Sequence, residues 1–186
     1  MCSIIGYLGD ISATKILVSG LKRMEYRGYD SAGVATFSDS QIQVRKGVGK
    51  VEQVDNSANL QTLPGNIGIG HTRWATHGGV NETNAHPHLS SSGQIAIVHN
   101  GIIDNYKELK EILQNRKYFF KSETDSEIIA NLLQYHYDST KDIKRSIIKT
   151  VNELKGDYSF VAVFPNGTLG AARFHEPLII GVGKKG

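Results

Sequence analysis

The residue with the clearest chemical potential in this sequence is Cys2, its only cysteine, which directly follows Met1. A side chain as small as cysteine at this position permits removal of the initiator methionine, which would leave a free α-amino group beside the thiol. An α-amine has a pKa of about 7.7–8.0 and a free thiol about 8.5, so this amine could act as a general base at neutral pH. The alternative interpretation is a small, buried residue at the start of a β-strand.

Two polar, glycine-containing segments could bring further functional groups to this thiol. The first is EYRGYDSAG, residues 25–33, whose composition is also that of many surface loops. The second is GHTRWATHG, residues 70–78, which holds the only tryptophan and Arg73. A guanidinium can bind a carboxylate through two parallel hydrogen bonds, and Thr76 and the backbone around His77 could add donors.

Two more segments have the residue types of an anion site and a cation site. In His99-Asn100-Gly101, the asparagine amide and the glycine N–H could converge on one oxygen, as a tetrahedral oxyanion requires. The alternative is an ordinary Asn-Gly turn. In SETDSE, residues 122–127, the side chains could cap the next helix, and Asp125 could also hold an ammonium group.

The histidines of the sequence suggest a metal site, but their spacing does not favour one. NAHPH, residues 84–88, would have to combine with His71, His77 and His99. No pair has the spacing of a metal-binding helix and no carboxylates are interleaved, so we expect no metal. There is also no phosphate-binding loop, dinucleotide fingerprint or nucleophile elbow. A nucleophile with its own base, an oxyanion site, a carboxylate site and an ammonium site together match glutamine.

Length and composition predict one globular domain in a reducing compartment. The 186 residues are 39% hydrophobic and 21% charged, with a net charge of +3 that indicates a solvated mixed surface rather than nucleic-acid binding. One cysteine excludes an internal disulfide, which favours the cytoplasm. No apolar run approaches the ~20 residues of a membrane span, and the first residues do not resemble a signal peptide.

The pattern of apolar residues predicts strands and helices in groups rather than in strict alternation. Expected strands cover residues 2–8, 34–37, 42–44, 66–72, 94–99, 158–164, 168–174 and 178–182. Expected helices cover residues 12–24, a short stretch near Val51, and residues 105–114, 125–137 and 141–154. Asn166-Gly167 predicts a hairpin turn, Ser38-Asp39-Ser40 a turn between two short strands, and residues 74–88 a long irregular loop. This order favours antiparallel sheets with helices on their outer faces, an α+β fold.

Taken together, EYRGYDSAG, GHTRWATHG, NAHPH, VHNGIIDNY and SETDSE closely resemble the class II glutamine amidotransferase domain of the N-terminal nucleophile hydrolases. The resemblance runs from Cys2 to about Gly183 and implies a four-layer αββα sandwich. Within that family it points to enzymes that hydrolyse L-glutamine and use the ammonia to convert fructose 6-phosphate to glucosamine 6-phosphate. It implies that residues 1–186 are the glutaminase domain, cut before a sugar-isomerase half, with no cofactor and a homodimeric full-length protein.

The resemblance also implies catalytic roles. Cys2 would attack the glutamine amide with its own α-amine as base, acting through a water. Asn100 and Gly101 would form the oxyanion hole, and Arg27 would lie near the nucleophile.

Substrate-binding roles follow from the same resemblance. Arg73, helped by Thr76 and His77, would bind the α-carboxylate of glutamine, and Asp125 its α-ammonium group. Tyr29 would take part in closing the site. Trp74 would lie on a mobile loop over glutamine and help to control the passage of ammonia.

Two departures and three alternatives accompany this assignment. Ser3 stands where the family has glycine after the nucleophile, and His175-Glu176 precede Pro177 where the family has a small residue. The domain could instead serve another acceptor, as in a phosphoribosyl amidotransferase, an asparagine synthetase or a glutamate synthase. It could be a non-catalytic assembly or sensing domain if Met1 is retained. An N-terminal nucleophile peptidase is disfavoured because no propeptide beyond Met1 itself is expected.

Overall fold

Two four-stranded antiparallel sheets face each other in the computed structural model, which describes residues 2–75 and 78–183. The first sheet has the order β1 (Ser3–Leu8), β4 (Ile67–Arg73), β2 (Ser31–Ser38) and β3 (Gln41–Val48). The second has the order β5 (His88–Leu89), β6 (Ala96–Ile103), β7 (Gly156–Val163) and β8 (Leu169–Phe174). Thr76 and His77, which were expected to contribute to the carboxylate site, lie outside the described residues.

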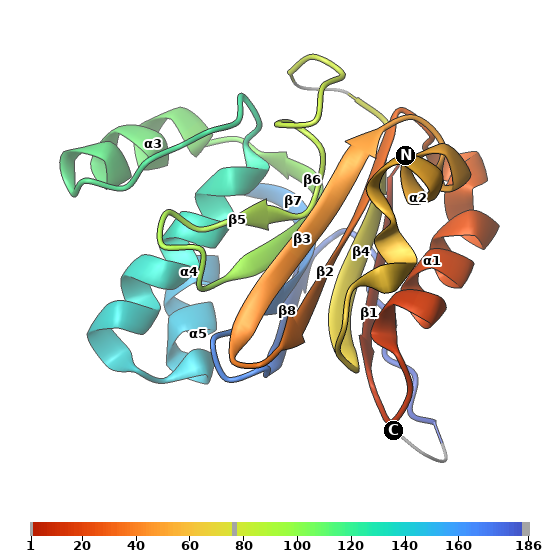
Figure 1. Ribbon diagram of the computed structural model, residues 1–186. Helices are drawn as coiled ribbons and strands as arrows, with labels where there is room; N and C mark the ends of the chain where they lie inside the picture. The colour runs from red at the N-terminus through yellow and green to blue at the C-terminus, as the bar shows by residue number, and fades with distance from the viewer. Residues whose placement is uncertain (1, 76–77, 184–186) are drawn as a thin grey trace.

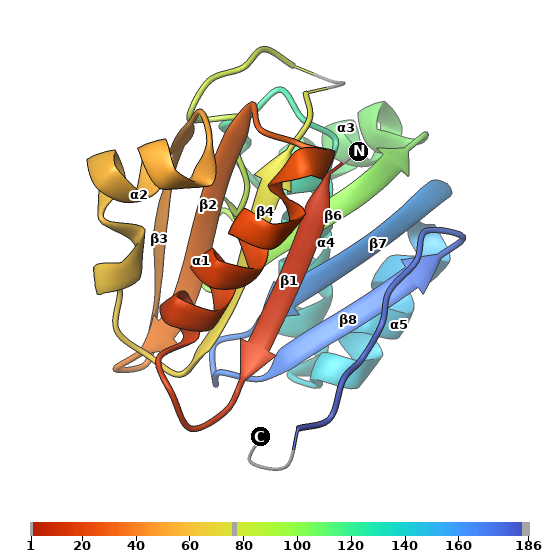
Figure 2. The same ribbon diagram turned by 90° about the vertical axis from the view of Figure 1, so that its right-hand side faces the viewer.

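Helices cover the outer face of each sheet (Figures 1 and 2). α1 (Ala13–Met24) and α2 (Val51–Ala58) lie on the first sheet, and α4 (Ser126–Thr140) and α5 (Ile143–Glu153) on the second. α3 (Tyr106–Asn115) packs against α4, and two short 3-10 helices, η1 (Glu25–Arg27) and η2 (Leu60–Thr62), follow α1 and α2. The predicted α+β fold with an αββα arrangement is therefore confirmed.

Strand alternation sorts the apolar residues into three layers. Leu17, Leu21 and Val34 belong to a cluster between α1 and the first sheet. A second cluster, which contains Ile97 and Ile129, lies between the second sheet and α4. The inter-sheet core consists of Ala35, Ile69, Ala96, Val98, Val161 and Val163, all buried. Each large apolar side chain buried in this way contributes about 1.5–3 kcal/mol.

The two predicted hairpins are present. Asp39 and Ser40, between β2 and β3, have φ angles of 52° and 60°, which a two-residue type I′ turn requires. Gly167, between β7 and β8, has φ of 79°, and its N–H donates to the Phe164 carbonyl at 2.9 Å. These turns fix the registers β2–β3 and β7–β8.

Three sequence-based expectations about strands need correction. β2 begins at Ser31, so the end of the expected 25–33 loop is a strand, paired with β3 and β4. β6 extends to Ile103 instead of ending at His99, because β7 pairs with it over that whole length. Residues 178–182 form no strand, and Ile179, Ile180 and Val182 are exposed. Apolar composition alone predicted that strand, but no neighbouring strand pairs with it among the described residues.

The helices of the described part of the chain do not include one with the length and apolar character needed to span a membrane.

Candidate active site

The alternation of β1 directs Cys2 into the layer between the sheets, on the same face as Ile4 and Gly6. Its Sγ accepts a hydrogen bond from the Trp74 N–H at 3.2 Å and donates one to the Trp74 carbonyl oxygen at 3.5 Å. Burial raises the pKa of the Cys2 thiol, although the Trp74 N–H and the Arg73 guanidinium act in the opposite direction. The thiol is therefore protonated at neutral pH, and a nucleophilic role requires a base.

Asn100 and Gly101 lie within β6, opposite Ser159 and Tyr158 of β7. The interpretation of Asn-Gly as a turn is therefore wrong. Asn100 Nδ2 donates to the Cys2 carbonyl oxygen at 3.3 Å, which places the amide beside Cys2. Gly101 has φ of 117°, and an added Cβ would lie 2.0 Å from the Asp157 carbonyl oxygen, so this position requires glycine.

One edge of β6 is open where Asn100 and Gly101 lie. Within the described chain, β5 pairs with β6 only at Ala96 and Ile97. Further along this edge, the Ile103 N–H donates to Asp125 Oδ2 at 2.8 Å. Because alternate N–H groups of a strand point the same way, the Gly101 N–H faces this edge too. The Gly101 N–H can therefore donate a hydrogen bond at this open edge.

Asp125 stands at the N-cap of α4, but its side chain caps nothing there. It is 6% exposed, and its carboxylate turns toward β6, where it accepts the Ile103 N–H. Ser126 Oγ lies 3.4 Å from the other carboxylate oxygen and 2.8 Å from His99 Nδ1. The interpretation of Asp125 as a helix cap only is thus wrong, and the buried carboxylate is held at the open edge of β6.

Arg73 ends β4 and is 4% exposed. Its Nη1 and Nη2 donate to the carbonyl oxygens of Gly79 and Gly78 at 3.2 and 3.5 Å. The guanidinium therefore braces the segment just beyond Thr76 and His77. Gly78 and Gly79 directly follow Thr76 and His77, the two residues that were expected to help Arg73 bind a carboxylate.

Residues 28–30 hold the backbone around Trp74. The Asp30 carboxylate accepts the Ala75 N–H at 2.8 Å, and the Asp30 N–H donates to the Arg73 carbonyl at 3.0 Å. Gly28 packs so closely that an added Cβ would lie 2.9 Å from the Trp74 nitrogen. Sequence reasoning gave no role to Asp30 or Gly28, although both belong to the EYRGYDSAG segment that it singled out.

Two aromatic side chains stand at the rim of the site. The rings of Tyr29 and Trp74 meet edge to face with centroids 5.5 Å apart, and the residues are 46% and 43% exposed. Arg27 is half-buried in η1. Neither Tyr29 nor Arg27 lines the cavity at Cys2, so their predicted roles remain predictions.

The other predicted residues that the structure describes meet in one cavity of about 40 Å³ beside the thiol. This volume is enough for roughly three water-sized groups. The cavity is lined by Cys2, Arg73, Trp74, His86, His99, Asn100, Gly101, Thr124, Asp125 and Ser126. The structure thus brings together a thiol, an amide, a guanidinium and a carboxylate from segments far apart in the sequence.

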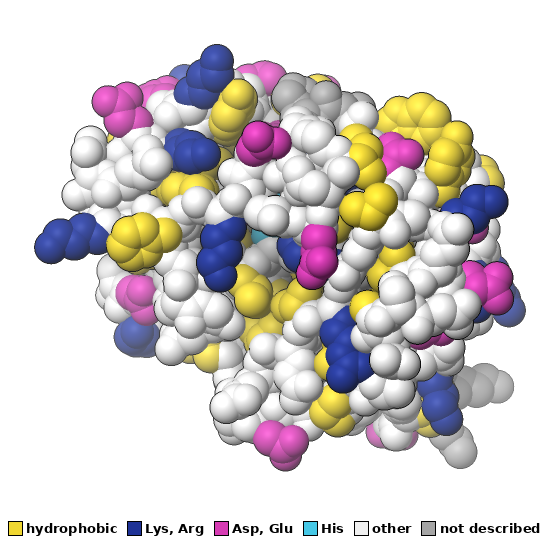
Figure 3. All heavy atoms as spheres, turned by 45° about the horizontal axis from the view of Figure 1, so that its top comes forward, with side chains coloured by type: hydrophobic (Ala, Val, Ile, Leu, Met, Phe, Trp, Pro, Cys, Tyr) yellow, Lys and Arg dark blue, Asp and Glu magenta, His cyan; other side chains and the backbone are white. Residues whose placement is uncertain are grey.

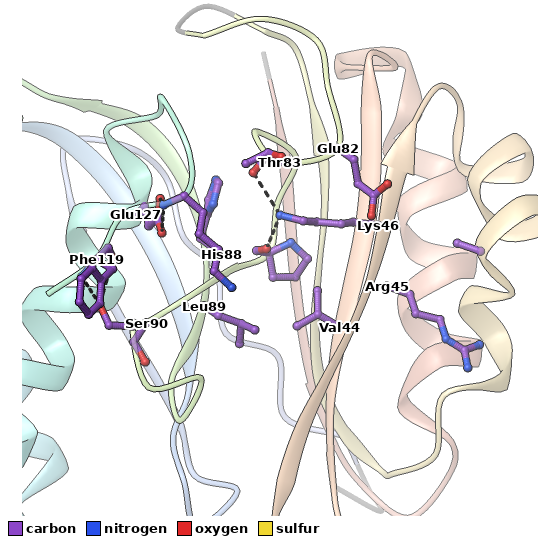
Figure 4. A pocket seen from close by; sticks show the side chains of 14 residues that line it. Val44, Arg45, Lys46, Glu82, Thr83, His88, Leu89, Ser90, Phe119 and Glu127 are labelled. Atoms are coloured by element: carbon purple, nitrogen blue, oxygen red, sulfur yellow. Dashed lines mark hydrogen bonds between the residues drawn. The ribbon is translucent and has the colours of Figure 1, made fainter.

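A larger cavity of about 510 Å³ opens between β3 and the segments 82–91 and 119–127 (Figures 3 and 4). Lys46 crosses it, and its Nζ donates to the carbonyl oxygens of Thr83 at 3.3 Å, Ala85 at 2.5 Å and Pro87 at 3.2 Å. Burial lowers the pKa of Lys46 to about 8. None of the predicted catalytic residues lines this cavity, so the chemistry points to the smaller one.

Four buried histidines support the smaller cavity, and we call them the histidine cluster: His71, His86, His88 and His99. The ring centroids of His71 and His86 are 4.1 Å apart, and those of His86 and His88 are 4.5 Å apart. Burial lowers the pKa of His71 to about 3 and that of His99 to about 4, so these rings are neutral. Across residues 2–75 and 78–183, no three His, Cys, Asp or Glu side chains are placed to hold a metal ion.

Comparison with known proteins identifies relatives of this arrangement. The family model described as a glutamine amidotransferase domain matches residues 71–184. Glutamine–fructose-6-phosphate aminotransferase (isomerizing) of Pyrococcus horikoshii is 49% identical over 186 residues, which cover 99% of this chain and 31% of that protein. The Methanococcus maripaludis protein of the same name is 48% identical over 99% of this chain and 32% of its own length.

A solved structure shares the fold at lower sequence similarity. The glutamine phosphoribosylpyrophosphate amidotransferase of B. subtilis, complexed with ADP and GMP, superposes with a TM-score of 0.76 at 27% identity. The match covers 89% of this chain and 35% of that one. The chain thus spans about a third of the length of the curated relatives it matches.

Proposed function

This chain belongs to the glutamine amidotransferase domain family, and from that premise we propose that it hydrolyses the side-chain amide of L-glutamine with Cys2 as nucleophile. The observation that carries the proposal is the single cavity in which Cys2 meets Asn100, Gly101, Arg73 and Asp125. No subset of these residues would suit a glutamine substrate as well as the whole does. A carboxamide would fit beside the thiol, and the α-carboxylate and α-ammonium groups would lie toward Arg73 and Asp125.

The reaction begins with proton transfer from the Cys2 thiol to its own α-amine, directly or through a water, once Met1 has been removed. The thiolate attacks the amide carbon, and the carbonyl electron pair moves to oxygen. Asn100 Nδ2 and the Gly101 N–H stabilise this oxyanion, a contribution that typically amounts to ~10²–10³ in rate for one donor. The protonated α-amine gives its proton to the leaving nitrogen, the oxyanion re-forms the carbonyl as the C–N bond breaks, and ammonia departs to leave a thioester on Cys2.

Hydrolysis of the thioester completes the cycle. Water, activated by the same α-amine, attacks the acyl carbon and again forms an oxyanion at Asn100 and Gly101. The C–S bond breaks, glutamate leaves and the thiol regains its proton. The raised pKa of the Cys2 thiol supports the need for this base, because an unassisted thiol here would stay protonated.

The other predicted residues have supporting roles in this proposal. Thr76 and His77 would assist Arg73 at the α-carboxylate, and Arg27 would lie near the nucleophile. Trp74 and Tyr29 contact each other at the rim, which supports a role in covering bound glutamine and in the passage of ammonia.

We also propose the larger context of the reaction. The relatives with 48–49% identity are named for transfer to fructose 6-phosphate, whereas the phosphoribosylpyrophosphate enzyme is 27% identical. A sugar-isomerase half, in a longer homodimeric protein, would therefore use the ammonia to make glucosamine 6-phosphate, and residues 1–186 would be its glutaminase domain. A single unpaired cysteine that must stay reduced supports a cytoplasmic location.

The experiment that tests this function is ammonia release from glutamine by two forms of the protein. One form has Met1 removed, as verified by intact mass, and the other retains it. We expect release only from the processed form and none after alkylation of Cys2. Equal release from both forms would overturn the mechanism, because a retained Met1 covers the amine that acts as base.

A further inference from the structure

The side chain of His71 extends from β4 of the first sheet to β6 of the second, beside the candidate site. It lies on β4 between Ile69 and Arg73, and alternation directs all three side chains toward β6. His71 Nε2 lies 3.1 Å from the His99 carbonyl oxygen and 3.0 Å from Asn100 Oδ1. One ring nitrogen therefore contacts two consecutive residues of the strand that carries the oxyanion site.

The His99 carbonyl fixes which ring nitrogen of His71 carries the hydrogen. A carbonyl oxygen can only accept a hydrogen bond, so His71 Nε2 must donate to it. A neutral imidazole has one N–H, and burial lowers the pKa of His71 to about 3, so Nδ1 then carries a lone pair. This conclusion does not depend on how the Asn100 amide is oriented.

The same hydrogen also fixes the Asn100 amide. With Nε2–H as a donor, the amide atom 3.0 Å away must be the oxygen, because an NH₂ group there would place two donors face to face. The nitrogen is then forced to the opposite side, where it lies 3.3 Å from the Cys2 carbonyl oxygen. A rotated amide would instead present its oxygen to the developing oxyanion and repel it.

We infer that His71 is a positioning residue that keeps the Asn100 amide turned with its N–H toward the oxyanion of the glutaminase reaction. The inference rests on the proposed function and gives the histidine cluster a role in it. His71 acts through Asn100 and contacts no reacting atom.

The surroundings of His71 keep the ring in this place. The His86 ring packs against the His71 ring with centroids 4.1 Å apart. The residues on either side of His86, Ala85 and Pro87, both accept hydrogen bonds from Lys46 through their carbonyl oxygens. Gly33 lets this segment approach, since an added Cβ would lie 2.3 Å from the His86 carbonyl oxygen. Lys46 and His86 thus brace the ring from the side of the larger cavity.

His71→Leu and His71→Gln form a matched pair for testing the role. Leucine removes the donor, and glutamine can place an N–H near the position of Nε2. We expect His71→Leu to lower kcat for ammonia release about 10²–10³-fold, as for loss of one oxyanion donor, with KM changed less than about threefold. His71→Gln should recover most of kcat. A KM effect as large as the kcat effect in the leucine variant, or no recovery with glutamine, would contradict the role.

A double-mutant cycle separates positioning from a general structural role. Because His71 acts through Asn100, His71→Leu should cost almost nothing further in an Asn100→Ala background. An aldehyde analogue of glutamine, which forms a tetrahedral adduct with Cys2, should bind His71→Leu more weakly by the same factor as the loss in kcat/KM. Glutamate should bind both proteins alike. Independent, multiplying losses in the cycle would overturn the inference.

A measurement on the unmutated protein covers the case in which the leucine variant does not fold. Nitrogen-15 NMR of labelled histidine distinguishes the two neutral tautomers, and we expect the Nε2–H form for His71 in the folded protein. An Nδ1–H tautomer would overturn the inference. This readout does not require ammonia release, so it distinguishes failure of the His71 role from failure of the proposed function.

Discussion

The layer between the two sheets has an apolar end and a polar end, and the same strands build both. On β4, Ile69 packs into the inter-sheet core, whereas His71 and Arg73 on the same face reach the candidate site. On β6, Val98 belongs to that core and Asn100, two residues later, lies beside the thiol. Strand alternation thus delivers side chains to the layer along its whole length, and residue type alone changes from one end to the other.

This difference separates stability from chemistry. The apolar end gains free energy from burial, at about 25 cal/mol per Å² of apolar surface. The polar end buries an amide, a guanidinium, a carboxylate and several imidazoles, groups that are costly to bury unless they are hydrogen-bonded. We therefore expect substitutions at the apolar end to change the free energy of unfolding, and substitutions at the polar end to change the rate.

Cys2→Ala should have the largest effect on rate of any change at the polar end. Alanine at this position still permits removal of Met1 but supplies no nucleophile, so ammonia release should fall to background, a loss of at least about 10⁴-fold. The side chain is only half-buried, and its thiol contacts one backbone segment, so the melting temperature should change little. Ammonia assays and thermal unfolding measure the two quantities.

Ile69→Ala is the matched change at the apolar end. The residue is fully buried, and its truncation should cost about 2–5 kcal/mol of unfolding free energy. The fraction that remains folded should keep kcat within about threefold. If Ile69→Ala lowered kcat of the folded protein well beyond threefold, or if Cys2→Ala unfolded the protein, the apolar end would not be separable from the polar end as the source of stability alone.

Acid should destabilise the protein through its polar end. Burial lowers the pKa of His71 to about 3 and that of His99 to about 4 in the folded protein. Both imidazoles therefore stay neutral in the folded state at pH values where the same rings in the unfolded chain, with a pKa near 6.5, bind protons. Stability should therefore be complete above pH 6.5 and be lost as the pH falls toward 3–4, by up to about 1.4 kcal/mol per pH unit for each ring.

Denaturant unfolding between pH 7 and 4 measures this dependence, and His71→Gln isolates one ring. Carboxylates contribute a slope of the same sign, so the difference between the two proteins is the informative quantity. Glutamine does not titrate, so its slope should be smaller by up to about 1.4 kcal/mol per pH unit. Identical slopes between pH 6 and 4.5 would show that His71 is not held neutral.

Much of this arrangement was predictable from local sequence patterns. The alternation of apolar residues, the Asp39-Ser40 and Asn166-Gly167 turns and the helical periods predicted the two-sheet fold, and all five helices lie close to their expected ranges. Cys2 was singled out because it directly follows Met1, Asn100 because its amide stands beside a glycine N–H at the end of an apolar strand, and Asp125 because its carboxylate lies at the start of a predicted helix. Those signals are local, so one sequence is enough to show them.

The rest depends on contacts between distant segments. Asn100-Gly101 has the composition of a turn, and only the pairing with β7 shows that the strand continues through it. Nothing along the chain shows that His71 and Asn100 meet, because that contact depends on how the two sheets are stacked. The apolar residues 178–182 show the converse, since they have strand composition but no strand partner among the described residues.

Substitutions of Asp125 test whether one residue of the polar end contributes both to glutamine binding and to the free energy of unfolding. Its carboxylate accepts the buried Ile103 N–H, so Asp125→Ala should cost about 1–3 kcal/mol of stability as well as substrate affinity. Asp125→Asn keeps an acceptor for that N–H but loses the charge. It should raise KM for glutamine about 10–100-fold, the size of a charge-assisted hydrogen bond, with a much smaller change in stability.

Steady-state kinetics and unfolding curves of both Asp125 variants distinguish the roles. A nearly normal KM in Asp125→Asn would show that the carboxylate serves the Ile103 N–H and not an ammonium group. Equal destabilisation by asparagine and alanine would mean that the charge itself, at the N-terminus of α4, stabilises the fold.

Ser3 should give the smallest effect, and it sharpens the comparison because it is adjacent to the proposed nucleophile. Relative to the family glycine, Ser3 adds a side chain to a stretch of backbone that could pass close to the thiol or the substrate. Alternation instead directs it to the other face of β1, where it is 3% exposed and its Oγ donates to the Met24 carbonyl at 3.2 Å. Ser3→Ala should therefore cost about 0.5–1.5 kcal/mol of stability and leave kcat within about twofold.

Ser3→Gly, the residue of the wider family, should cost a further 0.5–1 kcal/mol or so, since glycine weakens a strand. A tenfold change in kcat in either variant would show that the two faces of β1 are coupled, and that position on the inter-sheet face is not what separates chemistry from stability.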